Sequence, residues 1–128
     1  MLLNVQTAPG EFLDKLTILE IKAERMTEPA KLANVERELA LLRETWAASP
    51  LSVRDVGTLV AALKRINEAL WEIEDHIRDK EAARVFDAEF VELARSVYRS
   101  NDRRAAIKRE LNVMLGSEIL EEKSYTEY

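Results

Sequence analysis

The chain of 128 residues has no cysteine and a single histidine. These absences exclude disulfides, thiolate metal sites and metal sites that need several histidines. No stretch approaches the roughly 20 apolar residues of a membrane-spanning helix. The opening residues, M-L-L-N-V-Q-T-A, also lack the basic start and apolar run of a signal peptide. We therefore expect a cytoplasmic protein without a membrane partner.

Glycine and proline are scarce too, with three of each, while charged residues make up 34% of the chain and apolar residues 47%. This composition is typical of long helices and of one folded domain, here residues 1–128. The formal net charge is −5, which provides no overall attraction to nucleic acid. We expect no nucleic-acid partner.

Apolar periodicity and stop signals predict an all-α protein. Four helices are expected, over residues 8–26, 27–48, 52–84 and 87–115. Polar side chains that precede each apolar pattern are the predicted N-caps: Thr7, Thr27, Ser52 and Asp87. Short connections between consecutive helices favour two antiparallel hairpins, the second much longer than the first. Residues 1–7 would form a short arm and residues 117–128 an acidic tail.

The third helix carries a coiled-coil-type seam at alternating steps of three and four residues. The seam consists of Val56, Leu59, Leu63, Ile66, Leu70, Ile73 and Ile77. We expect the other helices to pack along this helix. A long apolar seam in so small a protein also favours exposure of part of it to a second copy, so a homodimer is predicted.

One set of polar residues lies beside that seam. Asn67, Trp71, Glu74 and Arg78 share one helix face. If the third and fourth helices are antiparallel, Trp71 lies near Asn101 and Asn67 near Ala105. The predicted ligand-binding residues are Asn67, Trp71, Glu74, Arg78, Tyr98, Asn101 and Arg104. The alternative is that Trp71 belongs to the core and that Glu74 and Arg78 form a surface ion pair.

Two further clusters have simpler interpretations. The basic run of the fourth helix comprises Arg95, Arg99, Arg103, Arg104, Lys108 and Arg109. We expect it to be neutralised within the chain by two acidic groups, the tail and the third-helix residues Glu72, Asp75 and Asp79. In the first helix, Asp14 could act with a second carboxylate, but no partner can be assigned from the sequence. His76 is expected to be a surface residue.

Several stretches resemble a family of small uncharacterised bacterial proteins. They are G-E-F-L-D-K-L-T-I-L-E-I-K at 10–22, L-W-E-I-E-D-H-I-R at 70–78, V-Y-R-S-N-D-R-R at 97–104, and E-E-K-S-Y-T-E-Y at the C-terminus. The resemblance implies a domain of unknown function, associated with bacterial gene neighbourhoods for surface polysaccharide synthesis. It implies no catalytic residue.

Two functional hypotheses follow. The first is a non-enzymatic protein-interaction or assembly module, because the chain has a helical seam, high charge and no catalytic motif. The alternative is a small-molecule or anion-binding protein, or an enzyme, linked to surface polysaccharide metabolism, with its polar site between the third and fourth helices. No catalytic residue, metal or cofactor is predicted in either case. The alternative requires the polar residues to line one concave pocket.

Overall fold

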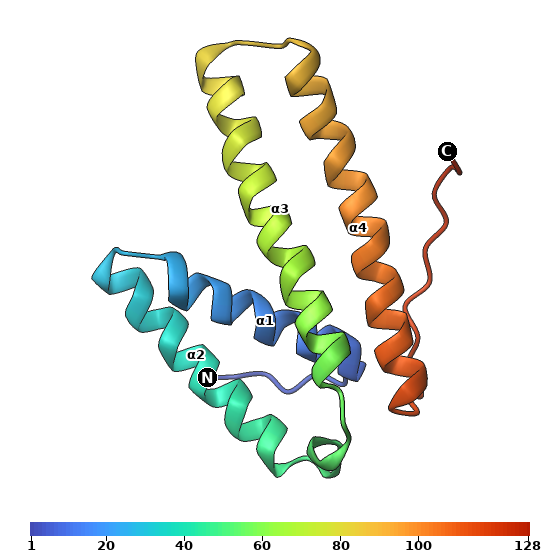
Figure 1. The fold of residues 1–128 in the computed structure, drawn as a ribbon. Coiled ribbons are helices and arrows are strands. Elements are labelled where there is room, and N and C mark those ends of the chain that lie inside the picture. The colour runs from blue at the N-terminus through green and yellow to red at the C-terminus, as the bar shows by residue number, and fades with distance from the viewer.

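The computed structural model describes residues 1–128 as an all-helical fold with no strand (Figure 1). Its elements are α1 (Pro9–Arg25), α2 (Pro29–Ala48), the short 3-10 helix η1 (Pro50–Val53), α3 (Gly57–Ala83) and α4 (Ala88–Met114). The predicted all-α fold with four helices and a long second hairpin is therefore confirmed. None of the helices combines the length and apolar character needed to cross a membrane.

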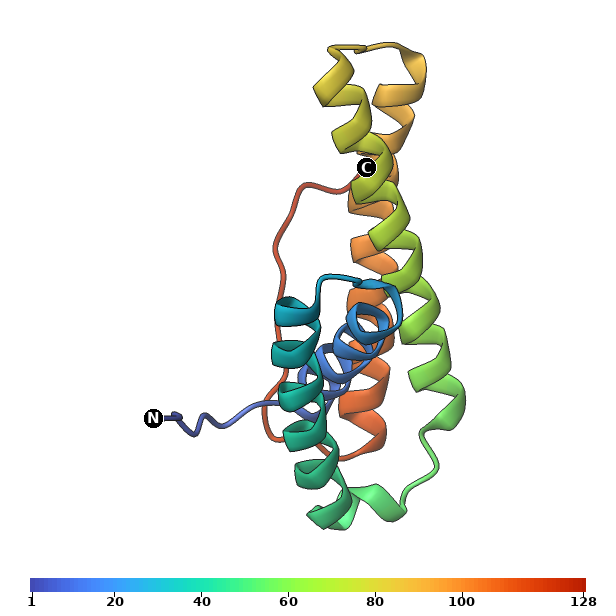
Figure 2. The same ribbon diagram turned by 90° about the vertical axis from the view of Figure 1, so that its left-hand side faces the viewer.

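The two hairpins cross, and α1 lies at the crossing (Figures 1 and 2). Helix α1 packs against α2, α3 and α4, whereas α2 packs only against α1 and η1. The expectation that all helices pack along the third helix is therefore wrong for α2. The helix that joins the fold together is α1, because it is apolar on more than one face: Leu13, Leu16, Leu19 and Ile21 are all buried.

The core lies at the base of the long hairpin, where α1 and α2 cover it. Its buried cluster comprises Leu13, Leu16, Leu19, Leu39, Leu63, Leu111 and Leu115. Beyond α1, the α3–α4 hairpin continues without cover (Figure 2). The seam residues Ile73 and Ile77 are only half-buried there, and Val85, Phe86 and Val91 are exposed around its tip.

Only one of the four predicted N-caps is confirmed. The Asp87 carboxylate accepts a hydrogen bond from the backbone N–H of Phe90 at 3.0 Å. The cap residues of α1, α2 and α3 are instead Ala8, Glu28 and Val56, none with a side-chain cap. Proline in the first turn of α1 and α2 already removes a backbone donor that would need a cap. Ser52 belongs to η1, where its hydroxyl donates to the Ser49 carbonyl at 2.8 Å, so α3 starts only at Gly57.

Gly10 allows the start of α1 to approach α4 closely. Its buried N–H donates to Asn112 Oδ1 at 2.7 Å. A Cβ on Gly10 would lie only 2.5 Å from the Lys108 carbonyl oxygen, which real Cβ atoms do not tolerate. The contact ties α1 to α4, and this tie holds α1 across the inner face of the long hairpin.

Gly116, with φ +67°, follows the end of α4, as the sequence predicts for a glycine that terminates a helix. The C-terminal segment, residues 117–128, then runs back along α4 in an extended conformation (Figures 1 and 2). Glu121 pairs with Lys108 at 3.5 Å and Glu122 with Arg109 at 3.3 Å. The segment is therefore docked on the helix by charge pairs.

Candidate functional site

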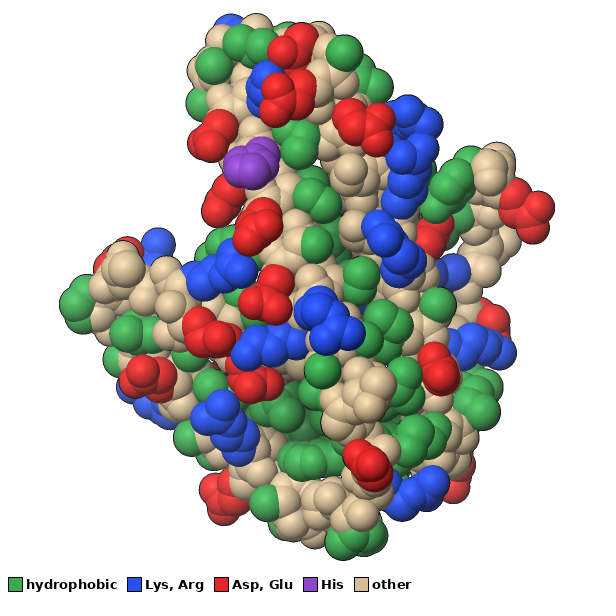
Figure 3. Space-filling view, viewed as in Figure 1, with side chains coloured by type: hydrophobic (Ala, Val, Ile, Leu, Met, Phe, Trp, Pro, Cys, Tyr) green, Lys and Arg blue, Asp and Glu red, His purple; other side chains and the backbone are tan.

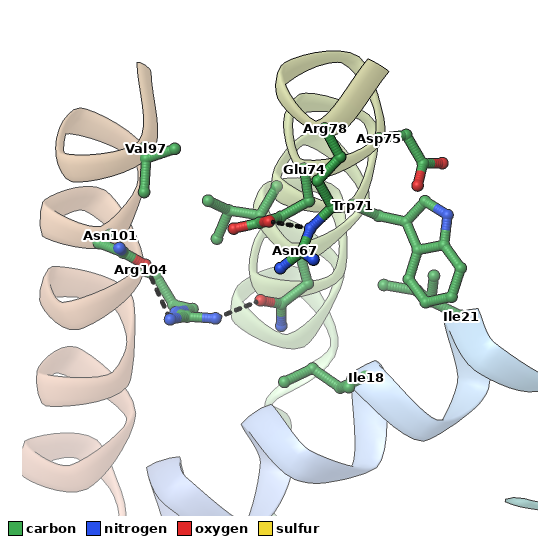
Figure 4. A pocket seen from close by; sticks show the side chains of 11 residues that line it. Ile18, Ile21, Asn67, Trp71, Glu74, Asp75, Arg78, Val97, Asn101 and Arg104 are labelled. Atoms are coloured by element: carbon green, nitrogen blue, oxygen red, sulfur yellow. Dashed lines mark hydrogen bonds and ion pairs between the residues drawn. The ribbon is translucent and has the colours of Figure 1, made fainter. Parts of the chain in front are cut away.

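A groove lies where α1 crosses α3 and α4 (Figure 4). Its volume is about 460 Å³. Six of the seven predicted ligand-binding residues line it: Asn67, Trp71, Glu74, Arg78, Asn101 and Arg104. Helix α1 adds Ile18 and Ile21, and Leu70 and Val97 complete the apolar part of the lining. The structure therefore brings these polar side chains to one concave surface.

The predicted register of the long hairpin agrees with the observed contacts to within one residue. Asn67 bonds to Arg104, which is the neighbour of its predicted facing residue, Ala105. Trp71 is half-buried and lies in the groove lining, outside the buried core cluster. Glu74 and Arg78 form the expected surface pair at 3.0 Å. The surface pair and the groove thus coexist on the same helix face.

Arg104 is the most unusual group in this groove. Its Nη1 donates to Asn67 Oδ1 at 3.0 Å, and its Nη2 donates to Asn101 Oδ1 at 2.8 Å. Both bonds are partly buried, both acceptors are neutral amides, and no carboxylate forms an ion pair with the guanidinium. A guanidinium has five N–H donors, and these two bonds leave three of them available to a ligand.

Asn67 holds Arg104 in place. This side chain is buried, and its Nδ2 donates both to Asp14 Oδ1 at 2.8 Å and to Thr17 Oγ1 at 3.0 Å. With its oxygen accepting from Arg104, the amide connects α1, α3 and α4. Because both amide protons are already engaged, Asn67 orients Arg104 and has no free donor for a ligand.

Asp14 and Thr17 are the residues that the sequence analysis did not place in this network. Asp14 is buried, and its Oδ2 lies 3.7 Å from Lys108 Nζ. Gly10, Asp14, Thr17 and Ile21 follow one another at steps of four, three and four, so they share one face of α1. Asp14 and Thr17 therefore lie on a helix face that also carries Gly10 and Ile21. This pattern is the sequence signal that could have indicated that the two polar side chains are buried against another helix.

Lys108 links this network to the C-terminal segment. It pairs with Glu11 and Asp14 of α1 and with Glu121 of the segment. Burial by itself lowers the pKa of Lys108, but the hydrogen bond that Lys108 donates to Glu11 and the charges of Asp14, Glu11 and Glu121 outweigh burial and raise that pKa above its ordinary value. The ammonium group is therefore a fixed positive charge at neutral pH.

The basic run of α4 is only partly neutralised within the chain: Arg95, Arg99, Lys108 and Arg109 pair with acids, whereas Arg103 and Arg104 form no ion pair. The tail prediction is confirmed by Arg109 and Glu122, while Arg95 and Arg99 pair with Glu92 of their own helix. The predicted pairing with the acidic residues of the third helix is wrong. Glu72 faces α1, where it pairs with Arg25 at 3.5 Å.

Tyr98 is the one predicted residue outside the groove. It lines a second pocket, of about 920 Å³, between α4 and the end of the C-terminal segment. The walls of this pocket on the segment side are Lys123, Tyr125, Thr126, Glu127 and Tyr128. Asn101 and Arg104 line both pockets. We call the first the Trp71 groove and the second the tail pocket.

No three histidine, aspartate or glutamate side chains come together as a metal-ligand set. His76 is exposed on α3, as predicted, and is visible on the surface in Figure 3. The two pockets present a guanidinium with donors that the chain does not use, an amide, and aromatic rings on either side.

Comparison with known proteins adds the family. Neither a curated protein nor a solved structure matches the chain. The model of the family of unknown function DUF6165 matches residues 3–128, so the match spans nearly the whole fold described above. This finding confirms the resemblance to a domain of unknown function. The protein therefore belongs to the DUF6165 family.

Proposed function

We propose that the protein binds a small organic anion in the Trp71 groove, with the negative group on Arg104. The observation that carries this proposal is a partly buried guanidinium held by two amide oxygens and paired with no carboxylate. Arg104 is half-buried, and its unused donors remain accessible to a ligand. The planar fork of arginine matches a phosphate or carboxylate in a bidentate geometry, and Asn67 and Asn101 fix the orientation of that fork in advance.

The remainder of the groove supports a ligand with a flat or ring-shaped apolar part. The Trp71 ring and the side chains of Ile18, Ile21 and Leu70 form an apolar surface beside Arg104. Its volume, about 460 Å³, lies within the usual range for small-molecule sites. Aromatic surface beside a charge-binding group is the combination that holds a ring and its anionic substituent.

The test is calorimetric titration with AMP, which carries a phosphate and a flat ring, and with benzoate as a carboxylate counterpart. Replacing Arg104 by Gln removes hydrogen bonds to a charged group, each of which contributes about 1.5–3 kcal/mol. We expect Arg104→Gln to weaken binding at least about tenfold. Arg103→Gln is the matched control, because Arg103 is exposed on the same helix and outside both pockets. Equal effects of the two variants, or no binding of either probe at millimolar concentration, would contradict the proposal.

Tryptophan fluorescence gives an independent readout. The other tryptophan, Trp46, stacks on Phe12 with ring centroids 6.1 Å apart, and it does not line either pocket. In a Trp46→Phe variant, emission therefore reports on Trp71 alone. We expect AMP to change that emission, and we expect Arg104→Gln in the same background to remove the change. A signal that is unaltered by Arg104→Gln would mean that AMP reaches Trp71 without the guanidinium.

A second proposal is a protein-interaction or assembly role, with a homodimer as its simplest form. The specific observation is the uncovered end of the α3–α4 hairpin, where Val85, Phe86 and Val91 are exposed. Sedimentation at micromolar concentration tests the dimer. We expect a dimer for the unmodified protein and a monomer for Phe86→Ser with Val91→Ser, and a strictly monomeric unmodified protein would refute the proposal.

A further inference from the structure

We infer that the ligand site has two compartments that meet at Arg104, and that it takes an elongated anion with a ring system on each side of a phosphate bridge, the chemistry of a dinucleotide. This inference rests on the proposed function, because it places the phosphate on the same guanidinium. It adds the C-terminal segment, residues 117–128, to the ligand site.

The two compartments are the Trp71 groove and the tail pocket. They have volumes of about 460 and about 920 Å³, each large enough for one ring system. Asn101 and Arg104 line both, so the guanidinium stands at the junction. A ligand with only one ring and one anionic group would leave one compartment empty.

Each compartment offers aromatic surface. The Trp71 groove has its indole, and the tail pocket has Tyr98, Tyr125 and Tyr128. Tyr125 and Tyr128 are 76% and 77% exposed, so ring surface remains for stacking beside the contacts with Lys123 and Tyr98. Flat heterocycles stack on such rings without needing a specific hydrogen-bond pattern.

The C-terminal segment is held in a position that keeps the tail pocket open. The rings of Tyr98 and Tyr128 meet edge to face with centroids 4.9 Å apart, and the Tyr128 hydroxyl bonds to Asp102. Nearer to α4 in the sequence, Glu121 and Glu122 pair with Lys108 and Arg109. The segment is thus fastened at both ends, and its residues 123–127 span the pocket between these fastenings.

The tail pocket is lined by two cations, Arg104 and Lys123, and by two acids, Asp102 and Glu127. The Lys123 Nζ lies 5.6 Å from the centre of the Tyr125 ring and pairs with Glu121 at 3.6 Å. Arg104 pairs with no acid and has three donors left after its two amide bonds. Asp102, the nearest acid of α4 in this pocket, is engaged by the Tyr128 hydroxyl. The unused donors of Arg104 favour a bridging phosphate or diphosphate between two stacked rings.

The experiment compares diadenosine diphosphate with ADP by calorimetric titration of the full chain. Both probes have two phosphates, and only the first has two rings. We expect diadenosine diphosphate to bind at least about tenfold more tightly than ADP, since one stacked base contributes about one to two factors of ten. We expect Tyr128→Ala to reduce that advantage to about twofold or less. Tyr128 is exposed and lies outside the buried core cluster, so its replacement does not threaten the fold.

Val53→Ala is the control, because Val53 is also an exposed apolar side chain, and it lies in η1, away from both pockets and from the hairpin tip. It should leave both affinities within about twofold. Trp71→Leu, which keeps an apolar side chain, should also remove most of the advantage of the two-ring probe.

Two negative outcomes are distinguishable. If both probes bind equally, or if Tyr128→Ala leaves the advantage intact, while Arg104→Gln still weakens ADP binding at least about tenfold, the two-compartment site is wrong and the proposed function stands. If Arg104→Gln leaves ADP binding unchanged, or if neither probe binds at millimolar concentration, both proposals fall.

Discussion

Replacing Asn67 by Leu tests the polar connection on which the site depends. The substitution keeps the volume of the side chain but removes one acceptor and two donors, all of which are used. The main cost falls on Asp14, a buried carboxylate that loses its 2.8 Å bond. A hydrogen bond to a charged group contributes about 1.5–3 kcal/mol, and each neutral partner left unpaired adds about 1 kcal/mol. We expect a loss of about 3 kcal/mol in the free energy of unfolding.

Urea denaturation followed by circular dichroism measures this loss. For a domain of this size, about 3 kcal/mol corresponds to a fall of roughly 10 °C in Tm. Asn34→Leu is the control, because Asn34 is exposed on α2 and bonds only to Arg37 at 3.2 Å. Its effect should stay within about 0.5 kcal/mol. A loss below about 1 kcal/mol for Asn67→Leu would refute the view that this amide connects α1, α3 and α4.

Three other predictions concern the tie between α1 and α4, the start of α4 and its end. Gly10→Ala should destabilise the protein by about 1–3 kcal/mol, because the added Cβ would lie 2.5 Å from the Lys108 carbonyl oxygen. Gly57→Ala is the control: its Cβ would lie 3.6 Å from the nearest atom, Asp55 Oδ1, so it should be neutral or stabilising in the same urea titration. The Phe90 N–H and the Lys80 ammonium hold the pKa of Asp87 below its ordinary value of 3.8, so this carboxyl adds stability above its unfolded-state pKa and loses it as pH falls through the folded-state value. Thermal melts between pH 7 and pH 2 should therefore show a smaller loss of Tm on acidification for Asp87→Asn than for the unmodified protein, and identical slopes would contradict the assignment. Gly116→Ala should cost about 1–2 kcal/mol, since φ is +67° there, and an unchanged urea midpoint would show that the backbone relaxes.

The helices and most of the groove could be predicted because they depend on local periodicity. The seam from Val56 to Ile77 identifies α3, and the steps of four and three place Asn67, Trp71, Glu74 and Arg78 on one face. A short connection then sets the register with α4, which correctly predicts Asn101 and Arg104 opposite them.

The crossing of the two hairpins could not be predicted in the same way. It depends on contacts between residues far apart in the sequence, such as Gly10 with Asn112 and Asp14 with Asn67, and no local pattern specifies those pairs. For the same reason the central place of α1 and the buried role of Asp14 were missed. The antiparallel register of α3 and α4 predicts Tyr98 in the groove, but Tyr98 lines the separate pocket that the docked C-terminal segment forms.

The protein-interaction hypothesis and the ligand-binding hypothesis depend on different regions of the α3–α4 hairpin. The first needs the uncovered tip with Phe86, and the second needs the covered base with Arg104. Because the two regions lie at different heights on the hairpin (Figure 2), variants at one should leave the function of the other intact. Variants at the tip therefore test the interaction role, and variants at the base test ligand binding, each without altering the other.

The most direct test of the central claim is the NMR spectrum of the arginine side chains during titration with AMP. The claim predicts that the Nε–H signal of Arg104 shifts as AMP binds, because this group carries a free donor held by Asn67 and Asn101. The signal of the exposed Arg103 should stay in place. An unchanged Arg104 signal at saturation, or a larger shift at Arg103, would contradict the assignment of Arg104 as the anion-binding group.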